Sequence, residues 1–107
     1  MDQRISDIIK DFADDVKAKL KDNLVGIYLF GSYVKDTQND LSDIDILIIV
    51  KHYEPAIRKE MGSLSSVYSI NRNVIISPVI KELSIWEKNK KYDTLFYSDI
   101  EKYGIAL

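Results

Sequence analysis

The sequence predicts a small α/β (α+β) domain in which a mixed sheet of three or four strands is flanked by helices. Three short apolar runs alternate with amphipathic or polar stretches, an order typical of this class. The chain has 107 residues, of which 46% are hydrophobic and 30% charged, and this is enough for one packed core. We therefore expect residues 1–107 to form a single domain.

The first half of the chain predicts a helix followed by two strands. Apolar residues recur every three or four positions over residues 3–22, which is the period of an amphipathic helix. Residues 25–30 (VGIYLF) and 44–50 (IDILIIV) are continuous apolar runs and predict two buried strands. The polar stretch between them, residues 33–41, is expected to hold a helical turn and a loop.

The second half predicts three further helices and a third strand. Pro55 suits the first turn of a helix. Residues 74–80 (VIISPVI) predict a strand, and the proline within it indicates a sheet edge or a bulge. Two short helices are expected over residues 83–91 and 94–103, the second ending at Gly104.

Composition and charge exclude several classes of function. The chain has no cysteine and a single histidine, His52, which excludes disulfides, zinc sites built on cysteine and a Ser-His-Asp triad. A net charge of −2 argues against general nucleic-acid binding. The longest apolar run, residues 46–50, is far shorter than the ~20 residues that span a bilayer. We expect no membrane association and a soluble, cytoplasmic protein.

The acidic motif Asp43-x-Asp45 stands at the start of the second predicted strand. Residues two apart on a strand point to the same face, so these two carboxylates would project together. They would repel each other unless a cation neutralised them, and a few hard oxygen ligands suit Mg²⁺ or Mn²⁺. The simpler interpretation is a polar strand entrance that contributes to a turn.

Gly31-Ser32 stands ten residues before the acidic motif, at the exit of the first predicted strand. These two strand ends meet if the strands are antiparallel neighbours. Glycine allows a close approach of the backbone to a ligand, and the Ser32 hydroxyl can donate to a phosphate oxygen. Lys35, one turn further on, could add positive charge. Alone, Gly-Ser is an ordinary strand-ending turn, so the combination of the two motifs carries the hypothesis of a phosphate and metal site.

At these residues the chain resembles the minimal nucleotidyltransferase (MNT) family of the DNA polymerase beta-like superfamily. The signature of that family is Gly-Ser, about ten residues, Asp-x-Asp and an apolar strand, and the ending SDIEKYGIAL is also similar. The resemblance implies a palm-like nucleotidyltransferase core and metal-dependent transfer of a nucleoside monophosphate, AMP from ATP. It implies that Gly31 and Ser32 hold phosphates and that Asp43 and Asp45 bind Mg²⁺ as the catalytic carboxylates.

The chain departs from the family pattern at the third carboxylate. Family members usually carry this acid near the start of the third strand, whereas residues 71–78 (NRNVIISP) contain none. Asn73 is the nearest candidate for this third position, and its amide oxygen could bind a hard cation but could not act as a base. Lys35-Asp36 also stands where the family often has Arg-Gly. ATP and Mg²⁺ binding remain expected, and turnover remains open.

The resemblance also implies a partner. No separate acceptor-binding domain is expected, so the acceptor would be a partner protein or a small molecule. By family analogy the partner is a helical HEPN-like RNase of a toxin–antitoxin pair, which MNT members neutralise, in some cases by adenylylating a tyrosine. A homo-oligomer also stays open. We expect the aromatic residues of the C-terminal part to be core, with a partner interface as the alternative: Trp86, Tyr92, Phe96, Tyr97 and Tyr103.

Three functions are therefore compatible with the sequence. The spacing of the two motifs favours an active nucleotidyltransferase. The missing third carboxylate favours a catalytically weak or inactive module of the same fold that binds and neutralises or scaffolds a partner. A phosphate-binding α/β domain of unrelated function is the third.

Overall fold

Four strands form one mixed sheet in the order β3-β2-β1-β4. The central strand β1 (Leu24–Phe30) runs antiparallel to both β2 (Ile44–Val50) and β4 (Ile105–Ala106). The outer strand β3 (Ile76–Glu82) runs parallel to β2. The strand β3, which contains Pro78, lies at the edge of the sheet, so the edge position expected from this proline is confirmed.

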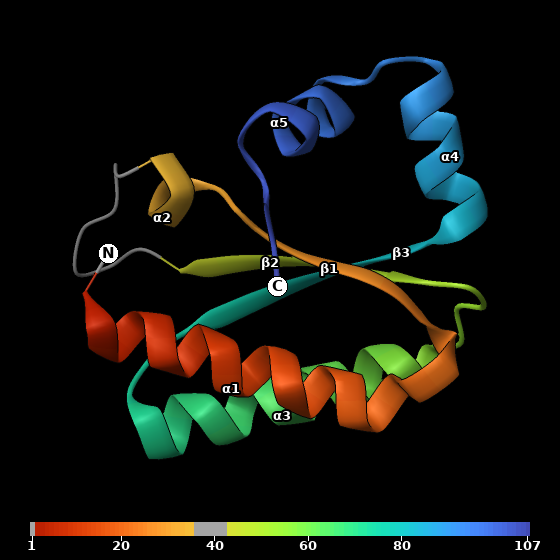
Figure 1. The fold of residues 1–107 in the computed structure, drawn as a ribbon. Coiled ribbons are helices and arrows are strands. Elements are labelled where there is room, and N and C mark those ends of the chain that lie inside the picture. The colour runs from red at the N-terminus through yellow and green to blue at the C-terminus, as the bar shows by residue number, and fades with distance from the viewer. Residues whose placement is uncertain (1, 36–42) are drawn as a thin grey trace.

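Helices cover both faces of this sheet, as Figure 1 shows: α1 and α3 lie on one face, and α2, α4 and α5 lie on the other. The computed structural model describes residues 2–35 and 43–107, so most of the predicted loop between the first two strands lies outside the described residues. Within the described residues the helices are α1 (Gln3–Leu20), the short 3₁₀ helix η1 (Lys21–Asn23), α2 (Ser32–Lys35), α3 (Pro55–Arg72), α4 (Leu83–Lys91) and α5 (Leu95–Tyr103).

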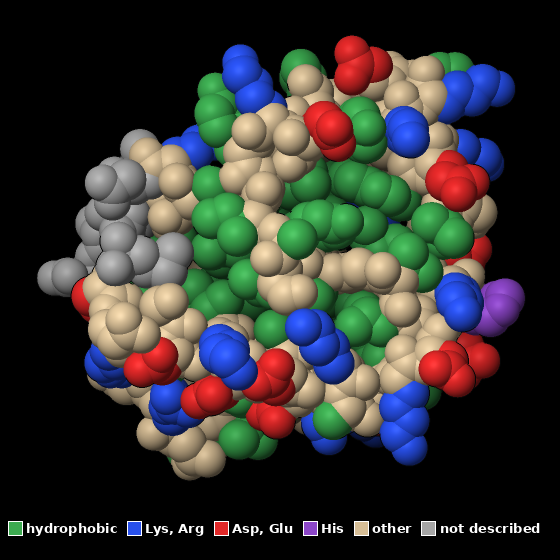
Figure 2. Space-filling view, in the orientation of Figure 1, with side chains coloured by type: hydrophobic (Ala, Val, Ile, Leu, Met, Phe, Trp, Pro, Cys, Tyr) green, Lys and Arg blue, Asp and Glu red, His purple; other side chains and the backbone are tan. Residues whose placement is uncertain are grey.

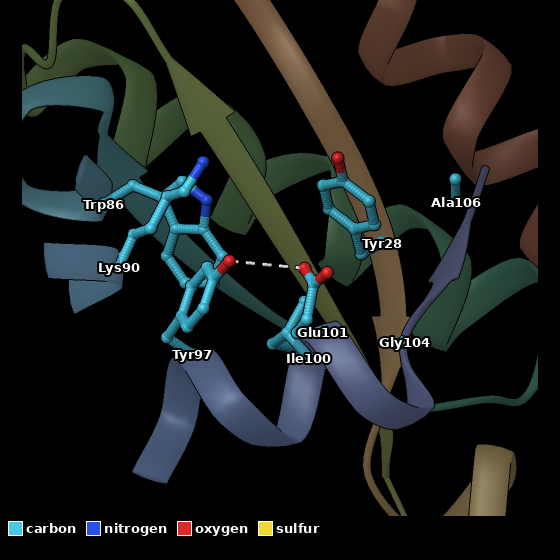
Figure 3. Close-up of a pocket in the computed structure, with 8 residues that line it drawn as sticks. All are labelled: Tyr28, Trp86, Lys90, Tyr97, Ile100, Glu101, Gly104 and Ala106. Atoms are coloured by element: carbon cyan, nitrogen blue, oxygen red, sulfur yellow. Dashed lines mark hydrogen bonds between the residues drawn. The ribbon is translucent and has the colours of Figure 1, made fainter. Parts of the chain in front are cut away.

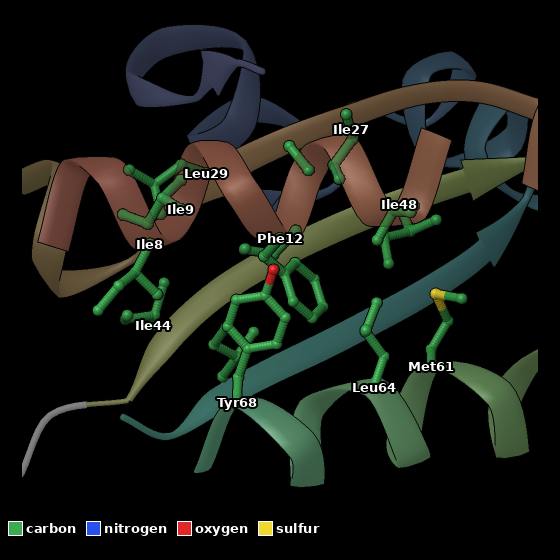
Figure 4. Close-up of a cluster of buried hydrophobic side chains, with 14 of the residues drawn as sticks. Ile8, Ile9, Phe12, Ile27, Leu29, Ile44, Ile48, Met61, Leu64 and Tyr68 are labelled. Atoms are coloured by element: carbon green, nitrogen blue, oxygen red, sulfur yellow. The ribbon is translucent and has the colours of Figure 1, made fainter. Parts of the chain in front are cut away.

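The main core lies between the sheet and the pair α1 and α3, and Figure 4 shows its side chains converging from these elements. The Asp2 side chain accepts a hydrogen bond from the Ile5 backbone N–H and so starts α1, whose apolar stripe then faces the sheet. At the centre, Phe12 is fully buried and packs edge to face on Tyr68 of α3, with ring centroids 5.3 Å apart.

A smaller apolar cluster fills the other face of the sheet, under α4 and α5. Leu47 and Ile49 of β2 alternate with the residues that face the main core, as the two-residue period of a strand requires. Phe96 of α5 packs edge to face on Phe30 of β1 and on Trp86 of α4. The expectation that C-terminal aromatics are core is confirmed for Trp86 and Phe96, whereas Tyr92 and Tyr103 are exposed.

Two of the element boundaries differ from the sequence expectation. The third strand begins at Ile76 rather than at residue 74, because α3 continues to Arg72 and Asn73 closes it in the left-handed conformation (φ 55°). The first helix ends at Leu20, since the chain then turns through η1. The fourth strand agrees with the predicted three or four strands, but it is only two residues long and no pattern in the sequence marks it. None of the described helices is long and apolar enough to cross a membrane.

Truncation of the central aromatic tests the main core. We expect Phe12→Ala to lower the free energy of unfolding by about 3–5 kcal/mol, because it leaves a cavity and removes the contact with Tyr68. Urea denaturation followed by circular dichroism measures this change. Leu95→Ala is the control, since Leu95 is 91% exposed and its truncation should change stability by less than about 0.5 kcal/mol. Equal losses in the two variants would contradict this account of the core.

Candidate functional site

The pairing of β1 with β2 brings the two sequence motifs together. Phe30, the last residue of β1, is the cross-strand partner of Asp45 in the antiparallel register. Gly31 follows Phe30, so the Gly-Ser turn and the acidic motif occupy the same end of the sheet. The two strand ends meet, as expected, because β1 and β2 are antiparallel neighbours.

Gly31 lies directly against the Asp45 carboxylate. Its φ of +82° is in the left-handed region, and a Cβ added there would collide with the Asp45 side chain, approaching the carboxylate carbon to 3.1 Å. The Gly31 carbonyl oxygen accepts hydrogen bonds from the backbone N–H groups of Val34 and Lys35, both at 3.2 Å, and so starts α2. Two independent constraints, a backbone conformation and a steric contact, therefore select glycine at this position.

The first turn of α2 exposes backbone donors beside the acidic motif. In the first turn of any helix the N–H groups lack intrahelical carbonyl partners, and here these belong to Ser32 and its neighbour Tyr33. Ser32 itself is half-buried. This arrangement suits an anion close to the carboxylates, provided that a cation lies between the two. The role of Ser32 as a phosphate ligand stays a prediction.

Asp45 of β2 and Asp43, just before the strand, lie two residues apart on the same side of the chain. Ile44 between them is 1% exposed and points into the main core, so the two acids face the opposite side. Burial raises the pKa of the Asp45 carboxyl, and the Asp43 charge raises it further. Both effects disfavour the charged form of Asp45. A divalent cation bound by the two carboxylates would relieve this electrostatic strain, so the donor set fits Mg²⁺ or Mn²⁺.

Lys35, the predicted phosphate-binding lysine, is paired within the chain. Its ammonium donates to Asp99 of α5 at 2.7 Å and lies 5.1 Å from the centre of the Tyr103 ring. These contacts join α2 to α5, which is remote in sequence. Phosphate binding by Lys35 stays a prediction, and it would require the ammonium to leave or share Asp99. Sequence reasoning missed Asp99, since no local pattern marks a partner 64 residues away.

The third position is occupied by uncharged residues. Asn73 closes α3 and lies before β3, so it does not belong to the strand beside the acids, and its part in a metal site stays a prediction. Ser77 is the strand partner of Asp45 in the parallel register. Ile75, whose carbonyl accepts the Ile44 N–H at 2.8 Å, stands beside Asp43 and is 59% exposed. The residues beside the acids are therefore Ser77 of β3 and Ile75, which lies just before that strand.

The next acid in the sequence, Glu82, cannot complete the pair. It lies opposite Val50 at the far end of β2, and its carboxylate accepts hydrogen bonds from the Tyr53 backbone N–H and the Ser84 hydroxyl. Among residues 2–35 and 43–107, no three His, Cys, Asp or Glu side chains cluster as a metal site. Within these ranges, the site therefore offers two carboxylates for a cation.

A cavity of about 290 Å³ lies on the other flank of α5 (Figure 3). Trp86 of α4 and Tyr97 of α5 form one wall, and the Tyr97 hydroxyl donates to Glu101 at 3.4 Å. Tyr28 of β1 and Ala106 of β4 lie on the opposite side. None of the predicted site residues lines this cavity, so it is separate from the site formed by Gly31, Asp43 and Asp45.

Comparison with known proteins shows the family of this chain. The family model described as "Nucleotidyltransferase domain" matches residues 9–107. A protein of Methanocaldococcus jannaschii that carries the provisional name protein adenylyltransferase is 35% identical over 105 residues, which cover 96% of this chain and 98% of that protein.

Solved structures show the same fold. A toxin–antitoxin structure with AMP-PNP superposes with a TM-score of 0.60 at 21% identity, covering 91% of this chain and 70% of that one. A provisionally described nucleotidyltransferase from Sulfolobus solfataricus gives a TM-score of 0.55 at 22% identity, covering 96% of this chain and 80% of that one. The structural match confirms the expected fold, and the family model and the archaeal relative show that this chain belongs to the nucleotidyltransferase domain family.

Proposed function

We propose that this chain transfers AMP from ATP to a hydroxyl group of a partner protein or a small molecule. The observation that carries the proposal is the contact between the Gly31 backbone and the Asp45 carboxylate at the junction of β1 and β2. That contact brings the Gly-Ser turn, which we propose binds phosphate, next to the pair of carboxylates, and nucleotidyl transfer needs both groups. Since the substrate is ATP, we place the reaction in the cytoplasm.

In this proposal each residue has a distinct task. The backbone at Gly31 and the N–H and hydroxyl of Ser32 bind and orient the β- and γ-phosphates. Asp43 and Asp45 hold Mg²⁺ or Mn²⁺, which would neutralise charge on the phosphate oxygens. Lys35 adds a positive charge once its ammonium turns from Asp99 toward the nucleotide. The chain thus contributes positioning and electrostatic stabilisation rather than a covalent intermediate.

We further propose that the acceptor is a protein. The provisional name of the archaeal relative, a protein adenylyltransferase, supports this choice. The structural match to a toxin–antitoxin protein supports a paired partner, and we propose that it is a HEPN-like helical toxin that this chain neutralises.

A second function is favoured by the residues at the third position. Ser77 of β3 and Ile75 just before it lie beside the acids, and neither side chain carries a carboxylate that could bind a second cation or act as a base. A module of this kind would bind nucleotide and partner without turnover. Neutralisation of the partner would then arise from occupancy of its surface rather than from its modification.

Removal of one carboxylate tests the transferase proposal. We expect Asp43→Asn to reduce AMP transfer to candidate partner proteins by about 100-fold or more, measured with labelled ATP and Mg²⁺. In metal-free buffer the melting temperature should stay equal or rise, because Asp43 destabilises the charged form of Asp45. Glu60→Gln, which removes an exposed negative charge from α3, should change neither quantity. Unchanged transfer in Asp43→Asn would refute the assignment.

The contact between glycine and carboxylate can be tested with two glycines of the same chain. We expect Gly31→Ala to lower stability by roughly 1–3 kcal/mol and to abolish the thermal shift caused by AMP-PNP with Mg²⁺, because the new Cβ collides with Asp45. Gly62→Ala is the matched control: a Cβ there meets nothing within 4 Å, so this helical substitution should stabilise by about 0.5–1 kcal/mol. Retained nucleotide binding in a folded Gly31→Ala variant would exclude this turn as the phosphate site.

Installing the missing acid separates the two functions. We expect Ile75→Asp to lower the Mg²⁺ concentration needed for half-maximal nucleotide binding severalfold, because a third carboxylate joins Asp43 and Asp45 on the same face. Ile70→Asp is the control, since Ile70 is 82% exposed on α3. If the natural chain is an inactive module, AMP transfer should appear only in Ile75→Asp. Equal transfer by the natural chain and the variant would instead exclude the inactive module.

A further inference from the structure

The strand β4 ends the sheet with outward-facing backbone groups. The Leu107 N–H donates to the Ile27 carbonyl at 2.9 Å, and Tyr28 is the cross-strand partner of Ala106. In an antiparallel pair, hydrogen-bonded and non-hydrogen-bonded residue pairs alternate. Since Ile27 and Leu107 are bonded, the N–H and carbonyl of Ala106 point away from β1. This edge can accept another strand at Ala106.

Apolar surface flanks this edge on both sides. A groove of about 500 Å³ separates β4 from α1, with Ile9 and Leu29 in its lining and Ile105, which is 47% exposed, on its rim. On the other side of β4 lies the aromatic cavity that Tyr28 and Ala106 line. Figure 2 shows the result as a broad hydrophobic area around the C-terminal strand. Such an area on a sheet edge is typical of an interface between proteins.

The exposed flank of α1 beside this groove carries charges in a self-complementary order. Asp7, Lys10, Asp14 and Lys17 recur at three- and four-residue intervals on one side of the helix. Consider a two-fold axis that passes beside α1 at the level of Phe12, so that a second α1 runs antiparallel to the first. Lys10 then faces Asp14 of the partner subunit. In the same arrangement Asp7 faces Lys17 of the partner subunit. Attractive contacts therefore arise on both sides of the axis.

The geometry points to a two-fold homodimer formed through this face, which goes beyond the proposed chemistry. A two-fold axis perpendicular to the sheet pairs β4 with β4 of a second copy at Ala106 and places the two α1 helices antiparallel on the same side. The groove runs along α1 from Ser6 to Lys17. Its middle is therefore level with Phe12, where the two-fold axis must pass for the charges to pair. The apolar edge, the free backbone groups of β4 and the charge order of α1 thus all fit the same binding partner at this face, a second copy of this chain.

The apolar part of the interface is tested by paired isoleucine variants. We expect the natural chain to sediment as a dimer at concentrations from about 5 to 500 µM, and Ile105→Asp to raise the dissociation constant about tenfold or more. Ile85→Asp is the matched control, since Ile85 of α4 is 45% exposed against 47% for Ile105 but lies away from this edge. Circular dichroism confirms that each variant is folded.

The charge pattern gives an independent test that does not rely on Ile105. Within one chain, Lys10 and Asp14 form an i,i+4 ion pair at 2.9 Å, but both side chains are largely exposed (75% and 54%), so breaking this pair costs the monomer little stability. In a dimer of the Lys10→Asp variant two acidic side chains face each other, and in a dimer of the Asp14→Lys variant two lysines do. We therefore expect each variant on its own to be a monomer. Mixing the two variants restores opposite charges at both positions, so a heterodimer of near-natural affinity should form.

The outcomes decide the proposal in either direction. Dissociation of each charge variant, with association of the mixture, supports the two-fold arrangement. A natural chain that is monomeric throughout, or one that associates only with a different protein, overturns it. An Ile105→Asp variant that dimerises like the natural chain, or a mixture of charge variants that stays monomeric, also overturns it.

Discussion

The antiparallel pairing of β1 with β2 is the constraint on which the candidate site depends. Their register sets Phe30 opposite Asp45, and the chain leaves β1 through a glycine whose missing side chain leaves room for the carboxylate. A shift of one residue would turn both acids into the main core, because side chains alternate between the faces of a strand. The buried residues Ile44 and Ile46, on either side of Asp45, prevent that shift.

The two faces of the sheet have different tasks. Hydrophobic burial against α1 and α3 supplies stability, and the fully buried residues of β2 anchor the strand that carries the acids. On the other face the acid pair occupies one end, and an aromatic cluster around Phe96 occupies the remainder. Repulsion between Asp43 and Asp45 is tolerated at the end of a strand that is otherwise deeply buried. The core thus supports a pair of carboxylates whose mutual repulsion a bound cation would relieve.

The helix α5 connects the regions that this chain would use for binding. Asp99 on one flank holds Lys35 of α2, next to the predicted phosphate turn. Tyr97 and Glu101 on the other flank line the cavity that reaches β4. The same helix leads through Gly104 into β4. A Cβ added at Gly104 would come within 2.6 Å of the Ile100 carbonyl oxygen, so the turn needs glycine. The sheet edge and the proposed nucleotide site are therefore both in contact with α5.

The sequence by itself determined the helices, the three main strands, the family and the pair of motifs, because these depend on periodicity and spacing along the chain. Only the tertiary structure decided which distant residues meet. The contact of Lys35 with Asp99 spans 64 residues and leaves no local pattern. The start of β3 depended on where α3 stops, so the residues beside the acids proved to be Ile75 and Ser77 rather than Asn73. The two residues of β4 form a strand only because β1 offers an unpaired edge, and that edge exists only after the sheet has assembled.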